Sequence, residues 1–107
     1  MGLLVSIFRL AQIRNYRSDL EYQIQLVHST KLDLSSQINS LVGLRTNLEP
    51  DSKEAKELEK KKERLMQAEK ALDQQLERYQ TQLDMINQEE QQVRQQKQEA
   101  IQRTFAA

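Results

Sequence analysis

The stretch Thr46-Asn47-Leu48-Glu49-Pro50-Asp51-Ser52 contains the only proline of the chain and separates two long segments with helical periodicity. Proline lacks a backbone N–H and disfavours the helical conformation in the residue before it. A helix that arrives from the N-terminal side should therefore end near Asn47. Asp51 is a good N-cap, and Glu54 three residues later completes the spacing of a capping box. The sequence thus predicts a corner, followed at once by a second helix.

The composition supports a helical rod-like protein rather than an average globular one. Of the 107 residues, 30% are charged, and there are only two glycines and one proline, a mixture typical of long helices and coiled coils. We therefore predict one all-α domain, residues 1–107, folded as a two-helix antiparallel coiled-coil hairpin and assembled into a helical homo-oligomer. The first helix should span about 3–46, the corner 47–51 and the second helix about 52–105.

A seam between the two helices is predicted by apolar residues that recur every seven positions. The corner centres near residue 51 or 52, so facing residues should have numbers that add up to about 103, which places Leu20 near Leu83. The residues predicted to form the hairpin seam are Leu20, Ile24, Val27, Leu34, Ile38, Leu41, Leu58, Leu65, Leu72, Leu76, Tyr79, Leu83, Ile86 and Val93.

Cationic residues alternate with apolar ones along the first helix's half of the seam, at Arg17, Lys31 and Arg45. Two interpretations of these positions stay open. Their long stems can lie along the seam while the charge reaches solvent, or the charges can fix the register by pairing across the hairpin. The second interpretation pairs Lys31 with Glu69.

The first helix begins with a segment, residues 3–13, that is apolar nearly all round and must therefore be buried or in lipid. The matching end of the second helix offers it few apolar partners, so the hairpin should not cover this segment by itself. We expect another copy of the chain to cover it, with a membrane surface as the alternative. The residues predicted to mediate self-assembly are Leu3, Leu4, Ile7, Phe8, Leu10, Ile13, Ile101 and Phe105.

Several functional classes are not expected from this sequence. With 16 basic and 16 acidic side chains the net charge is zero, and the run 60–62 of lysines is interleaved with glutamates, so we expect no nucleic-acid partner. No nucleophile with a base, glycine-rich loop or metal-ligand spacing is present, and His28 is the only histidine. We therefore predict that the chain is not an enzyme and uses no cofactor or metal.

The sequence leaves the location of the protein open. No apolar run approaches the roughly 20 residues of a spanning helix, and a cleavable signal peptide fits poorly because Arg9 interrupts the apolar N-terminus. The chain has no cysteine, which does not assign a compartment. Gly2 with a hydroxyl at Ser6 also matches the permissive pattern for N-myristoylation, and this modification stays open.

The two elements Leu48-Glu49-Pro50-Asp51-Ser52 and Ile101-Gln102-Arg103-Thr104-Phe105 resemble those of the small needle-filament subunits of type III secretion systems. The resemblance covers the corner and the end of the second helix. It implies a helical hairpin that polymerises and has a role in protein secretion. From the residues alone we expect a self-assembling subunit of a helical filament or tube. The alternatives are a coiled-coil chaperone, adaptor or stalk of an export apparatus, and a peripheral membrane protein anchored by residues 3–13.

Overall fold

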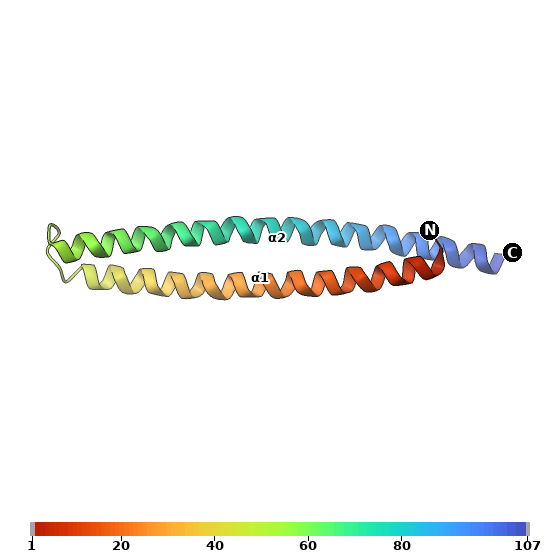
Figure 1. Cartoon of the computed structure of the whole chain (residues 1–107), viewed down its shortest axis with the longest axis horizontal. Coiled ribbons are helices and arrows are strands. Elements are labelled where there is room, and N and C mark those ends of the chain that lie inside the picture. The colour runs from red at the N-terminus through yellow and green to blue at the C-terminus, as the bar shows by residue number, and fades with distance from the viewer. Residues whose placement is uncertain (1, 107) are drawn as a thin grey trace. The chain divides into compact units, whose positions relative to one another are not determined.

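The computed structural model describes residues 2–106 as two long helices, α1 (Leu3–Arg45) and α2 (Lys53–Ala106), joined by the corner 46–52 (Figure 1). No strand is present in this part of the chain. The predicted all-α antiparallel hairpin is therefore confirmed. Both helices have bounds within one residue of the expected ones, because the heptad pattern and the single proline mark the same limits.

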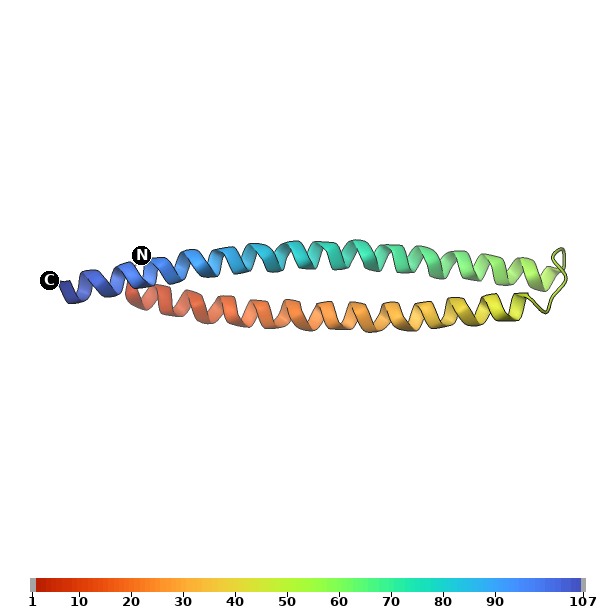
Figure 2. The same cartoon turned by 180° about the vertical axis from the view of Figure 1, so that it is seen from behind.

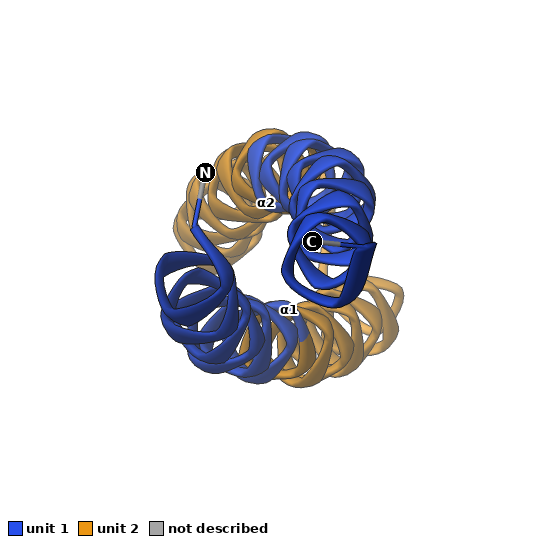
Figure 3. Ribbon diagram, turned by 90° about the vertical axis from the view of Figure 1, so that its right-hand side faces the viewer, with its two compact units in different colours: residues 1–24, 78–107 blue, residues 25–77 orange. Residues whose placement is uncertain are grey.

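The residues gather into two compact units, coloured separately in Figure 3. Unit 1 contains residues 1–24 and 78–107, and unit 2 contains residues 25–77. In each unit a stretch of α1 lies antiparallel to a stretch of α2, as the views from the front and from behind show (Figures 1 and 2).

At the end of α1, short-range hydrogen bonds within the corner take the place of the regular i to i−4 bonds of a helix. The Thr46 hydroxyl donates to the carbonyl of Gly43 at 2.7 Å, and the Leu48 N–H donates to the carbonyl of Arg45 at 3.0 Å. These bonds satisfy carbonyl groups that a terminating helix leaves without partners. The chain then turns at Pro50, as the sequence predicts.

The start of α2 differs by one residue from the prediction. The Ser52 hydroxyl accepts a hydrogen bond from the Ala55 N–H at 3.1 Å, so Ser52 is the N-cap. The predicted capping box of Asp51 and Glu54 is wrong, because Asp51 is taken up by a tight turn. In that turn the Ser52 N–H donates to the carbonyl of Glu49 at 3.1 Å, which delays the helix until after Ser52.

The core of unit 1 is a cluster of four buried aliphatic residues, Ile13, Leu20, Ile86 and Val93. Leu10, Tyr79 and Leu83 pack against it, so the predicted neighbours Leu20 and Leu83 lie in the same cluster. Every one of the fourteen residues predicted for the seam is buried or half-buried. This burial follows from the seven-residue spacing, which keeps one stripe of each helix facing the other.

Unit 2 shows the register of the hairpin through three polar contacts between α1 and α2. They join Lys31 to Asp73, Ser35 to Glu69 and Arg45 to Glu59. In each contact the residue numbers add up to 104, one more than the predicted sum. The small shift agrees with a corner that extends to Ser52 before α2 begins.

The predicted pairing of Lys31 with Glu69 is wrong. Lys31 forms its ion pair with Asp73, one turn further along α2, and Glu69 instead accepts a hydrogen bond from the Ser35 hydroxyl at 3.1 Å. A lysine stem is long enough to reach a carboxylate on the flank of the seam. The more exposed Asp73 therefore takes the role expected of Glu69.

Candidate assembly surface

Unit 1 exposes a group of large apolar side chains at the start of α1 and near the end of α2. Leu4 is 82% exposed, Phe8 is 65% exposed and Phe105 is 82% exposed. Val5 and Ile7 are also exposed. We call these five residues the apolar end. Grouped exposed apolar residues of this kind mark interaction surfaces more often than singly scattered ones do.

The other residues predicted for self-assembly divide into two groups. Leu3 and Ile101 are half-buried and lie beside the apolar end. Leu10 and Ile13 belong to the intramolecular core, and Ile13 is only 1% exposed. The assignment of Ile13 to self-assembly is wrong, because α2 covers its side chain. Leu10 is half-buried, so part of its side chain stays accessible. The hairpin thus covers more of segment 3–13 than its sequence suggested.

A pocket of about 210 Å³ lies next to the apolar end, between α1 and α2 of unit 1. Apolar side chains from α1 form one part of its lining and charged side chains, mostly basic, form the other. Its residues, which we call the basic pocket, are Ile7, Leu10, Ala11, Arg14, Glu90, Arg94 and Lys97. Three cations and one carboxylate line it, so its local charge is positive.

The basic pocket and part of the apolar end share one side of α1. Leu4, Ile7, Ala11 and Arg14 follow each other at spacings of three and four, which places them on one side of α1. Ile7 belongs to both features. This pocket could not be predicted from the sequence, because Arg14 lies about 80 residues before Arg94 and Lys97 in the chain. The sequence did carry one sign of it, because Lys97 occupies a position of the seven-residue repeat where an apolar residue is usual.

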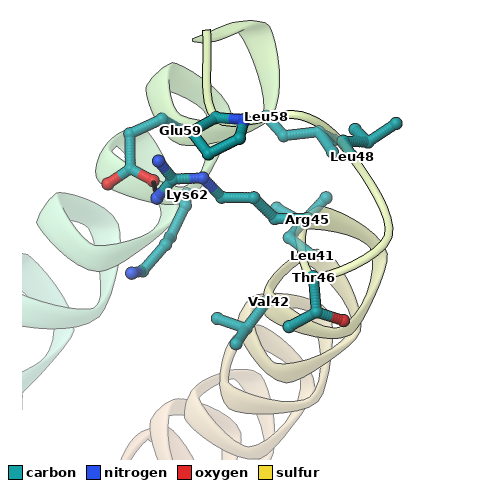
Figure 4. Close-up of a pocket in the computed structure, with 9 residues that line it drawn as sticks. Leu41, Val42, Arg45, Thr46, Leu48, Leu58, Glu59 and Lys62 are labelled. Atoms are coloured by element: carbon teal, nitrogen blue, oxygen red, sulfur yellow. Dashed lines mark hydrogen bonds and ion pairs between the residues drawn. The ribbon is translucent and has the colours of Figure 1, made fainter. Parts of the chain in front are cut away.

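A second pocket, of about 370 Å³, lies in unit 2 at the corner. Figure 4 shows the side chains that line it, with Arg45 reaching towards Glu59. Their ion pair has an Nη1–Oε2 distance of 2.5 Å. The lining is mainly apolar and includes three residues of the corner itself. The residues of this corner pocket are Leu41, Val42, Arg45, Thr46, Leu48, Pro50, Leu58, Glu59 and Lys62.

In the ion pairs between the two helices, the basic residue always comes from the same helix. Four such pairs lie within residues 2–106: Arg9–Glu89 and Arg17–Glu90 in unit 1, and Lys31–Asp73 and Arg45–Glu59 in unit 2. In each of them α1 supplies the base and α2 supplies the acid. Pairing two copies of α1 along this face would place like charges together, which disfavours that arrangement. The seam cations Arg17, Lys31 and Arg45 thus each pair with an acidic residue of α2, and their role in fixing the register stays a prediction.

Glu90 is the carboxylate most tightly held by this system. Its side chain is 18% exposed, and its Oε2 lies 2.5 Å from Nη1 of Arg17. Its Oε1 lies 3.4 Å from Nε of Arg94. The hydrogen bond from Arg17 is the main reason that the pKa of Glu90 lies below its ordinary value of 4.5.

The lowered pKa of Glu90 predicts an acid-sensitive contribution to stability. The folded state holds the Glu90 proton less tightly than the unfolded state does, so the contribution is complete above the ordinary pKa and is lost as the pH falls through the folded pKa. We expect Glu90→Gln to weaken the fall in melting temperature on acidification. Circular dichroism melts over a series of pH values measure this. Glu63→Gln, at an exposed position, is the control, and equal acid sensitivity of both variants would contradict the prediction.

Other kinds of site are not evident in the described residues. Within residues 2–106 no group of three or more histidine, cysteine or acidic residues could hold a metal ion. His28 is exposed. No helix in this part of the chain has a stretch long and apolar enough to cross a membrane. The features that stand out are therefore surfaces: the apolar end, the basic pocket and the corner pocket.

Comparisons of the chain with known proteins add no further constraint to these surfaces. No family model, curated protein or solved structure matches it.

Proposed function

We propose that this chain is a self-assembling structural subunit that forms a helical homopolymer. The observation that carries the proposal is the apolar end, where Leu4, Phe8 and Phe105 are largely exposed although α2 buries the neighbouring Ile13. Burial of one such side chain contributes about 1.5 to 3 kcal/mol. Three of them can supply several kcal/mol to a contact between copies.

The arrangement favours an open polymer over a closed dimer. The apolar end belongs to unit 1, whereas the corner pocket belongs to unit 2. A contact between two different surfaces is heterologous, and it generates a helix when the rotation does not close into a ring. The resemblance of the corner and of residues 101–105 to needle-filament subunits points the same way and favours a role in protein secretion.

The proposal predicts that single substitutions at the apolar end abolish the polymer without unfolding the hairpin. Phe8→Glu and Phe105→Glu should each leave the protein monomeric, because a carboxylate cannot be buried in an apolar contact without a large cost. Electron microscopy and sedimentation velocity measure assembly, and circular dichroism measures helicity. Tyr22→Glu is the matched control, since Tyr22 is an exposed aromatic residue of α1 outside the apolar end.

Two outcomes would overturn the proposal. A wild-type protein that stays monomeric at high concentration but binds lipid vesicles through residues 3–13 would be a peripheral membrane protein. A stable small complex with a different protein, with no homopolymer, would indicate an adaptor or the stalk of an export apparatus.

A further inference from the structure

We infer that the turn Glu49-Pro50-Asp51 of one copy docks into the basic pocket of the next copy, so that subunits join corner to unit 1. This inference rests on the proposed function and names the contact that propagates the polymer. Three features support it: the turn and the basic pocket have opposite charges, both surfaces include an apolar part, and the backbone of the turn is rigid.

The turn presents two carboxylates on a well-defined backbone. Glu49, Pro50 and Asp51 are all exposed, and the turn is closed by the hydrogen bond from the Ser52 N–H to the Glu49 carbonyl. Proline fixes its own φ and restricts the residue before it. Segment 46–52 contains no lysine or arginine, and neither carboxylate forms an ion pair within residues 2–106. The corner is therefore a rigid acidic tip.

The basic pocket has the complementary charge. Its carboxylate, Glu90, already interacts with Arg17 and Arg94. Arg14 and Lys97 have no carboxylate partner among the described residues. Two cations on the two walls of the pocket can therefore receive the two carboxylates of an acidic turn. Opposite charges meeting in a partly desolvated pocket fix the register of a contact and exclude wrong partners.

The apolar parts of the two surfaces also correspond. Pro50 lies between Glu49 and Asp51 in the sequence. Apolar side chains of α1 line the basic pocket together with its cations, so the proline ring has an apolar surface to contact. Beside the turn, Leu48 helps to line the corner pocket. Beside the basic pocket lies the apolar end, with Leu4 largely exposed. Each surface thus combines an apolar part with a charged part of opposite sign, a pattern typical of specific interfaces.

Charge reversal tests this contact through paired variants. The corner variant carries Glu49→Lys and Asp51→Lys, and the pocket variant carries Arg14→Glu and Lys97→Glu. Each variant alone should polymerise only at a critical concentration about tenfold or more above that of the wild type. In an equimolar mixture each reversed surface finds a partner of opposite charge. The mixture, and a chain that carries all four substitutions, should return to within about threefold of the wild-type value.

Matched controls separate this specific effect from a change in net charge. Glu57→Lys with Glu63→Lys changes the charge as much as the corner variant does, and Lys60→Glu with Lys61→Glu matches the pocket variant. All four control positions are exposed on α2 in unit 2. Both controls should polymerise at the wild-type concentration. Circular dichroism should show the same helicity in all variants.

The outcomes distinguish this inference from the proposed function. If the wild type polymerises and both reversed variants do so equally well, the docking inference fails while self-assembly stands. Impaired variants that neither mixing nor combination restores would also overturn it. A wild type that never polymerises removes the proposed function itself. If pocket reversal abolishes only binding to phosphatidylserine vesicles and leaves assembly unchanged, the occupant of the pocket is anionic lipid and the inference is wrong.

Discussion

Replacement of Ile13 by alanine is expected to lower the free energy of unfolding by about 2 to 4 kcal/mol, the largest loss that we expect from one aliphatic truncation in this chain. Ile13 is 1% exposed and lies in the cluster with Leu20, Ile86 and Val93. Truncation removes apolar contacts and leaves a cavity that two helices can only partly close. Urea denaturation followed by far-ultraviolet circular dichroism measures the change.

The same substitution at Ile7 provides a control within the same helix. Ile7 is 46% exposed, so Ile7→Ala should change the unfolding free energy by less than about 1 kcal/mol. Both variants must be measured at protein concentrations below the threshold for assembly, because Ile7 belongs to the apolar end. Equal losses at the two positions would mean that the core of unit 1 is not the one described.

Replacement of Ser6 by alanine is expected to raise the free energy of unfolding by about 1 to 2 kcal/mol. Ser6 has no exposed surface, and its hydroxyl oxygen has no hydrogen-bond partner in the described structure. Removing a buried polar group that lacks a partner relieves a desolvation cost, and alanine also has the higher helix propensity. Thermal and urea unfolding would both show the gain.

Ser18→Ala isolates the effect of burial from that of propensity. Ser18 is an exposed position of the same helix, so its substitution changes helix propensity without removing a buried hydroxyl. The gain from Ser6→Ala should exceed the gain from Ser18→Ala. Equal gains, or a loss at Ser6, would show that the Ser6 hydroxyl is satisfied in solution.

The features set by backbone chemistry and periodicity could be predicted from the sequence. Pro50 cannot continue a helix, and the heptad ladders of both helices keep fixed faces together, so the corner and the fourteen seam residues follow directly. The N-cap lies one residue later than predicted, because two residues in succession, Asp51 and Ser52, are suitable caps. The choice between them depends on a turn hydrogen bond, which no pattern of residue types specifies.

Features that depend on which side of a helix is covered were predicted less accurately from the sequence. Residues 3–13 are apolar nearly all round, so the sequence did not separate the buried Ile13 from the exposed Phe8. Lys31 had two acidic residues within one turn of its expected facing position, and the observed register, in which facing numbers add up to 104, places Asp73 rather than Glu69 opposite it. The basic pocket joins cations about 80 residues apart in sequence, a proximity that only the register of the hairpin creates.

The division into two units has a consequence for the order in which the chain folds. In unit 2 the ion pair between Arg45 and Glu59 joins residues 14 positions apart, whereas in unit 1 the hydrogen bond between Arg9 and Glu89 spans 80 positions. Short loops close at a lower entropic cost, so we expect pairing to begin beside the corner and to zip towards the termini. During synthesis residues 3–13 emerge long before residues 86–100 that cover them. The segment most prone to misassociation is therefore protected last, and a nascent chain has most need of a chaperone before unit 1 closes.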